Sequence, residues 1–80
     1  MRNDDVRDLQ TYLSYIGKII PEIPEIPVTG YYGPQTRDAV YTFQRLYGLP
    51  VSGQTGQNTW YRIAEEYNAL KGLNYSGFGV

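Results

Sequence analysis

A tract of nine residues occurs twice in this chain, 23 positions apart. Residues 28–36 read VTGYYGPQT, and residues 51–59 read VSGQTGQNT. The copies share an apolar residue, a hydroxyl residue, two glycines three apart and a threonine three further on. Each copy leads into apolar residues at three- and four-residue spacing, which is typical of an amphipathic helix. The repeat therefore predicts two copies of one loop-and-helix unit.

The composition limits the chemistry that this chain can perform. Its 80 residues make one small domain, and they include no cysteine and no histidine. Disulfides, thiol nucleophiles, the usual zinc ligands and the commonest general base are therefore excluded. We expect no metal and no cofactor, and the apolar core must stabilise the fold alone.

The charge pattern argues against nucleic-acid and membrane partners. The chain has seven Lys and Arg residues and eight Asp and Glu residues, and it contains no long run of either charge. No apolar stretch approaches the roughly 18 residues of a membrane span. The N-terminus is polar and lacks the apolar core of a signal peptide. We expect a monomeric module taken from a longer exported protein.

Three helices are predicted, over residues 5–16, 34–47 and 57–70. Asn3 or Asp4 can cap the N-terminus of the first helix. The predicted C-terminal stops of the three helices are, in order, Gly17, Gly48 and Gly72. The predicted fold is all-α, a small three-helix bundle with two pseudo-repeated loop-helix units. It comprises a tail over residues 1–4, the domain over residues 5–72 and a flexible tail or linker over residues 73–80. The inward positions are predicted to be Val6, Leu9, Leu13, Ile16, Thr36, Ala39, Val40, Phe43, Leu46, Trp60, Ile63, Ala64, Tyr67 and Leu70.

Residues 18–27 form a proline-rich segment that cannot be helical. Proline at every third position removes N–H donors and favours extended geometry in the residue before it. Ile20, Ile23 and Ile26 each precede a proline. We expect these isoleucines to lie over the core rather than to present a proline-rich ligand.

The residues shared by the two copies are predicted to be structural. Their glycines allow tight turns, and Thr36 and Thr59 stand at the third helical position, where a hydroxyl can bond back to the loop. The copies differ at Tyr31-Tyr32, which the second copy replaces by Gln54-Thr55. Adjacent side chains diverge, so one tyrosine is expected to point inward and the other to contact a ligand. Short extended pairing between the two loops is a further expectation.

The combined pattern resembles the peptidoglycan-binding domain 1 family. The family pattern has an aromatic-Gly-x-x-Thr tract, then Ala-Val-x-x-Phe-Gln, then Gly-Leu, then Gly-x-x-Gly-x-x-Thr-Trp. This sequence has the corresponding residues over 28–44, 48–53 and 56–60, and Val6, Leu9, Gln10 and Leu13 resemble its opening helix. The acidic residue that usually precedes each loop glycine is replaced here by Thr29 and Ser52.

The resemblance implies a non-catalytic module that targets an attached cell-wall hydrolase to murein, outside the cell or in a spore wall. Glycan strand or stem peptide would be its partner, together with a catalytic domain in the same parent chain. On this basis the candidate ligand-binding residues are Tyr31, Tyr32, Gln35, Arg37, Tyr41 and Arg45. Tyrosine rings would stack on sugars, and arginines would bind carboxylates. Gln44 is expected to bond to loop backbone instead.

Two other functions are weighed against this one. Similar three-helix modules serve as pro-domains, so a docking module that packs on a partner catalytic domain is the alternative. Catalysis is not expected, because neither Asp4/Asp5 nor Glu65/Glu66 places two carboxyl groups across a cleft.

Overall fold

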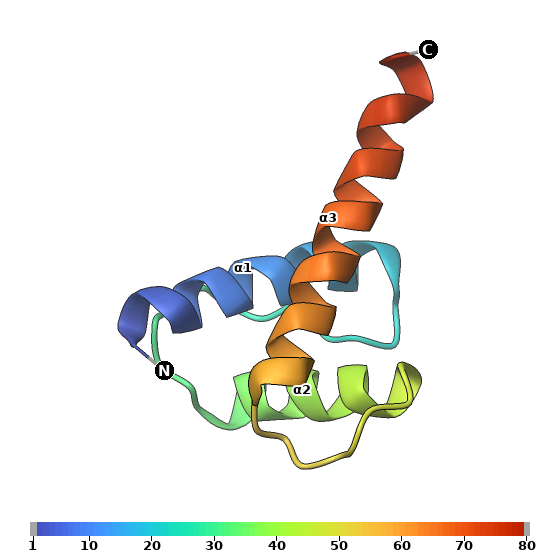
Figure 1. Cartoon of the computed structure of the whole chain (residues 1–80). Helices are drawn as coiled ribbons and strands as arrows, with labels where there is room; N and C mark the ends of the chain where they lie inside the picture. The colour runs from blue at the N-terminus through green and yellow to red at the C-terminus, as the bar shows by residue number, and fades with distance from the viewer. Residues whose placement is uncertain (1, 80) are drawn as a thin grey trace.

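The computed structural model describes the backbone of residues 2–79 and the side chains of residues 2–72. It has three helices in chain order: α1 (Asn3–Ile19), α2 (Pro34–Leu46) and α3 (Gln57–Gly79). No strand occurs within the described residues. Figure 1 shows α1 and α2 lying one above the other, with α3 crossing both. The predicted all-α three-helix bundle is confirmed.

The first helix is longer than the sequence pattern predicted. It begins at Asn3, and the preceding Arg2 is its N-cap, so neither Asn3 nor Asp4 caps it. The backbone N–H of Arg2 donates to Asp5 Oδ2 at 3.4 Å, which is one half of a capping box. The helix passes through Gly17 and ends at Ile19, so the predicted stop at Gly17 is wrong. The prediction that residues 18–27 are not helical is also wrong at Lys18 and Ile19, because the first proline stands only at position 21.

Gly17 is a contact site for the proline-rich strap (residues 20–27), which returns along α1. A Cβ at Gly17 would lie 2.7 Å from the Ile23 carbonyl oxygen, so only glycine admits the strap this closely. One turn earlier the Ser14 hydroxyl donates to the carbonyl of Ile26. These contacts hold the strap on one face of α1 and bury Ile23 and Ile26, as predicted.

The core lies where the strap and the three helices meet. Phe43 at its centre is fully buried, and Tyr47 stacks on it with ring centroids 4.1 Å apart. Tyr47 thereby takes the place predicted for Leu46, which is 46% exposed, so that inward assignment is wrong. Trp60, Tyr67 and Leu70 are partly buried against the core. The buried apolar residues are Val6, Leu9, Leu13, Ile16, Ile23, Ile26, Ala39, Val40, Phe43 and Ile63.

The end of α2 is a glycine stop of the predicted kind. Gly48 has a φ of +69°, a conformation that glycine adopts without a Cβ penalty. The Leu49 N–H donates to the Gln44 carbonyl at 2.9 Å, and the Gly48 N–H donates to the Arg45 carbonyl at 3.5 Å. This pair of bonds is a Schellman motif, and Pro50 follows it.

The third helix continues past Gly72 to Gly79, so the predicted stop at Gly72 is wrong. Figure 1 shows its C-terminal part extending away from α1 and α2. Whether residues 73–80 serve as a linker stays a prediction.

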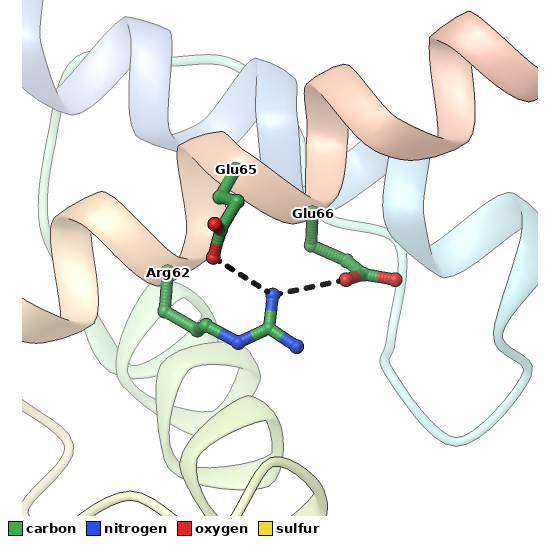
Figure 2. A network of polar contacts seen from close by, with 3 residues as sticks. All are labelled: Arg62, Glu65 and Glu66. Atoms are coloured by element: carbon green, nitrogen blue, oxygen red, sulfur yellow. Dashed lines mark hydrogen bonds and ion pairs between the residues drawn. The ribbon is translucent and has the colours of Figure 1, made fainter.

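A charged network joins α2 to α3 at Arg62. Its guanidinium Nη1 contacts Glu66 Oε1 at 3.0 Å and Glu65 Oε1 at 3.5 Å, as Figure 2 shows. The same guanidinium lies over the Tyr47 ring, 4.8 Å from its centroid. Burial, the Glu66 charge and a hydrogen bond to Glu66 raise the pKa of Tyr47 to about 12. The network ties the end of α2 to the middle of α3.

Candidate functional site

Loop one (residues 28–33) is organised by the buried side chain of Gln10 on α1. The Gln10 Oε1 accepts the backbone N–H groups of Thr29 at 2.7 Å and Gly30 at 2.9 Å. Its Nε2 donates to the Tyr31 carbonyl at 2.9 Å. The same Nε2 also contacts the Thr36 and Thr29 hydroxyls, at 3.0 and 3.2 Å. One carboxamide therefore fixes the whole turn between the strap and α2.

Loop two (residues 51–56) repeats this arrangement around Gln44 on α2. The Gln44 Oε1 accepts the N–H groups of Ser52 and Gly53, both at 2.9 Å. Its Nε2 donates to the Gln54 carbonyl at 3.0 Å and contacts the Thr59 and Ser52 hydroxyls at 3.2 and 3.4 Å. The expectation that Gln44 bonds to loop backbone is confirmed. Thr36 and Thr59 are buried and bond to these glutamine side chains.

The first glycine of each loop has a positive φ and lies under an arginine side chain. Gly30 has a φ of +85° and Gly53 a φ of +77°. A Cβ at Gly30 would lie 3.2 Å from Arg7 Nε, and one at Gly53 would lie 2.8 Å from Arg37 Cγ. The prediction of turn glycines is therefore confirmed at these two positions, where both backbone conformation and space favour glycine.

The second glycine of loop one has a different role. Gly33 has a φ of −104°, which any residue can adopt, so the predicted turn requirement does not apply here. Instead the Tyr31 ring covers it, because a Cβ at Gly33 would lie 2.5 Å from Tyr31 Cε2. The Tyr31 side chain is nevertheless 71% exposed. One side of the ring thus lies against the loop, and the ring remains accessible to solvent.

A hollow of about 160 Å³ lies beside this ring. Tyr31 and Gln35 are the two candidate residues on its wall. The other lining residues are Pro27, Thr29, Gly33, Pro34 and the buried Gln10–Thr36 pair. An accessible aromatic ring next to a carboxamide suits a ligand with both apolar ring faces and amide groups.

Tyr32 and Arg37 lie elsewhere and join the two loops. The Tyr32 hydroxyl donates to the Gly53 carbonyl at 2.8 Å and is 2.9 Å from the Thr55 hydroxyl. Burial raises the pKa of Tyr32, against the opposing effects of Thr55 and Arg37. Tyr32 is thus the inward tyrosine of the pair. The expected extended pairing is not found, since no backbone hydrogen bond joins the loops within the described residues.

The remaining candidates lie on the outward face of α2. Tyr41 is 47% exposed and Arg45 is exposed, one turn apart. Gln35 and Arg37 are about 200° apart around the helix axis, since each residue turns the helix by about 100°. The six candidates therefore do not form one groove. They divide into the hollow, the contact between the loops and the outer face.

The comparisons with known proteins assign the chain to a family. The family model described as "Putative peptidoglycan binding domain" matches residues 2–63. The chain belongs to this family. Searches of curated proteins and of solved structures give no significant match. Membership of the peptidoglycan-binding family indicates that peptidoglycan is the partner and that the domain is associated with the cell wall.

The peptidoglycan-binding family assignment fits the groups that the structure presents. Among the side chains that the structure describes, those of residues 2–72, no cluster of three or more potential metal ligands occurs. In the same part of the chain no helix is long and apolar enough to cross a membrane. The surface around the loops offers hydroxyls, carboxamides and tyrosine rings, which suit recognition of a polar polymer.

The sequence patterns missed two features of the site. Gln10 was identified only through family resemblance, although it stands 34 positions before Gln44 and each precedes a copy of the repeat. The second feature is a hollow at loop two, of about 340 Å³. An alignment of the two copies that included the preceding helices would have found the first, but not the second.

Proposed function

We propose that this domain is a non-catalytic module that binds peptidoglycan and targets an attached cell-wall hydrolase to murein. The proposal is supported by the family assignment together with one observation at loop one. The Tyr31 ring is held against Gly33, yet Tyr31 is 71% exposed as a residue and lines the hollow together with Gln35.

The position of the Tyr31 ring reduces the cost of binding. An exposed tyrosine normally loses side-chain freedom when a ligand covers it. Contact with Gly33 already restricts this ring, so less freedom remains to be lost. A pyranose ring that stacks on its outer face would place an acetamido group within reach of the Gln35 carboxamide, which can both donate and accept hydrogen bonds.

The outer face of α2 extends the proposed contact surface. Tyr41 and Arg45 lie on this face, and Arg37, at the contact between the loops, precedes Tyr41 by one turn. Neither arginine has a salt-bridge partner within the described residues. Guanidinium groups bind carboxylates strongly, so we assign these residues to the lactyl or stem-peptide carboxylates. Their contribution is smaller and decreases with salt, because these charges are exposed.

Sedimentation with purified, protein-free cell walls tests the proposal. The wild-type chain should pellet with the walls, and Tyr31→Ala should weaken this binding at least fivefold. Tyr61→Ala is the matched control, because Tyr61 is also an exposed tyrosine, at 61%, but lies on α3. Equal binding by both variants would remove Tyr31 from the site. If the wild-type chain does not sediment with walls but binds a catalytic domain, the result supports the docking alternative instead.

A further inference from the structure

The two loops differ in what covers their second glycine. Over Gly33 lies the Tyr31 ring, whereas a Cβ added to Gly56 would meet no atom within 4 Å. Position 31 corresponds to position 54 in the repeat, and glutamine stands there. Loop two therefore leaves open the place that an aromatic ring fills in loop one.

The hollow at loop two corresponds residue by residue to the hollow at loop one. Six of the residues that line the first hollow have their repeat equivalents, 23 positions later, in the second: Pro27 with Pro50, Thr29 with Ser52, Tyr31 with Gln54, Gly33 with Gly56, Pro34 with Gln57 and Gln35 with Asn58. Thr36 and Thr59 are a seventh pair, whereas Gln10 lines the first hollow and its equivalent Gln44 is not among the lining residues of the second. The second hollow has about 340 Å³, against about 160 Å³ for the first. The two loops have the same hydrogen bonds to a helix glutamine, but only loop one has a ring over its second glycine.

Neither backbone conformation nor packing requires glycine at position 56. Its φ is not positive, in contrast to Gly30, Gly48 and Gly53. Open space lies above it, so a side chain would fit within the protein. Gly56 lines the hollow, so a side chain there would extend into space that is open in the structure. The absence of a Cβ keeps this space free.

The wall of this hollow is polar but carries no charged group. Three carboxamides contribute to it, from Gln54, Gln57 and Asn58. All three residues are exposed, and none has a side-chain hydrogen bond within the described residues. Carboxamides both donate and accept, which matches the acetamido group of an N-acetylated sugar. A carboxylate ligand would find no cation here, so the stem peptide is the poorer fit.

We propose that the hollow over Gly56 is a second binding site, which takes one N-acetylated sugar unit of the glycan with its ring over the Gly56 backbone. This inference rests on the proposed function and adds a second contact to it. The sugar takes the place that Tyr31 occupies over Gly33. Gln54, Gln57 and Asn58 bond to its acetamido and hydroxyl groups.

Titration of the full, ¹⁵N-labelled chain with the trimer of N-acetylglucosamine tests this site by NMR. The amide signals of Gly56 and Asn58 should shift and saturate. Gln54→Tyr should fill the hollow with a ring, as Tyr31 does in loop one, and weaken this saturation at least tenfold. Asn68→Ala, at an exposed position on α3 about 15 Å along the helix axis from Asn58, should leave it unchanged.

A second variant keeps the test valid if Gln54→Tyr does not fold. Asn58→Ala removes an exposed side chain and should weaken trimer binding at least threefold at the same signals. The proposal is overturned if Gly56 and Asn58 do not respond to the trimer, or if both variants bind as the wild type does. The proposal is also overturned if these two signals respond to a synthetic stem tetrapeptide but not to the trimer.

The same samples separate this inference from the proposed function. The wild type could sediment with walls while the Gly56 and Asn58 signals do not respond to the trimer. That result would support the proposed function and contradict the second site. Failure of the wild type to sediment with walls would contradict the proposed function itself.

Discussion

Loop one carries the ring of Tyr31 over Gly33, whereas loop two carries nothing over Gly56. Beneath this difference the loops share one frame, in which a helix glutamine bonds two N–H groups, a carbonyl and two hydroxyls. Residues that build the frame are the same or similar in both copies. Of the residues that differ, Tyr31 and Gln54 are exposed, whereas Tyr32 points inward and bonds to loop two. The ligand contacts proposed above therefore lie on side chains outside the shared frame.

The largest expected effect comes from the two glutamines of the frame. Gln10→Leu or Gln44→Leu leaves several loop N–H and C=O groups without partners, which should lower the free energy of unfolding by about 3 kcal/mol in either case. Urea denaturation followed by circular dichroism measures both. If one variant is much more stable than the other, the two frames are not equivalent.

The positive-φ glycines should rank next. Gly30→Ala and Gly53→Ala each force a Cβ into the left-handed region, at a cost of about 1–2 kcal/mol. Gly53→Ala should cost more, because its Cβ would lie 2.8 Å from Arg37 Cγ, within the stem of that side chain. Thermal unfolding compares the pair, and Gly48→Ala serves as the reference for the cost of the positive φ alone, since its φ is +69° and nothing lies within 4 Å there. The reverse order would show that Arg37 moves aside more freely than Arg7.

Tyr32→Phe tests the contact between the loops. The loss of hydrogen bonding to Gly53 and Thr55 should cost about 1 kcal/mol at neutral pH. The pKa of Tyr32 is raised in the folded state. Its stabilising effect is therefore complete below the unfolded value of about 10 and is lost as the pH rises through the folded pKa.

The variant should accordingly lose less stability than the wild type as the pH rises above about 10, as measured by denaturation at fixed temperature. A smaller alkaline decline should remain, because Tyr47 also has a raised pKa, of about 12. Parallel stability curves for the two proteins would mean that the Tyr32 hydroxyl does not titrate differently on folding.

The smallest effects on stability are expected at the second glycines. Gly33→Ala only displaces the ring of an exposed tyrosine, and Gly56→Ala enters open space, so each should cost about 0.5 kcal/mol or less. Both should nevertheless weaken binding to cell walls, the first by moving Tyr31 and the second by filling the hollow. Stability loss above about 2 kcal/mol at Gly56 would mean that this glycine is structural after all.

The two candidate tyrosines show how far sequence reasoning could go. Their divergence in a tight loop predicted one inward and one outward side chain, and this is what the structure has. Which of them points inward depended on the position of loop two, since the Tyr32 hydroxyl finds its partners at Gly53 and Thr55. Local geometry alone could not supply that information.

The helix ends show the same limit. Gly48 was predicted correctly as a stop, because an apolar residue and a proline follow it and complete a local motif. Gly17 was predicted wrongly by the same rule. Glycine is required at position 17 because the Ile23 carbonyl approaches it closely. Ile23 belongs to the strap, which the helix pattern does not include.

By itself the sequence determined the helical class, the two repeated loops, the buried faces of α1 and α2 and the family, because each is carried by local spacing of apolar residues, glycines and prolines. The tertiary structure alone decided that the six candidate residues separate into three places and that an open hollow lies over Gly56. Such features depend on which segments meet in space, and two copies with the same local pattern meet different neighbours. The Tyr31 ring over one glycine and the empty space over the other are the clearest result of that difference.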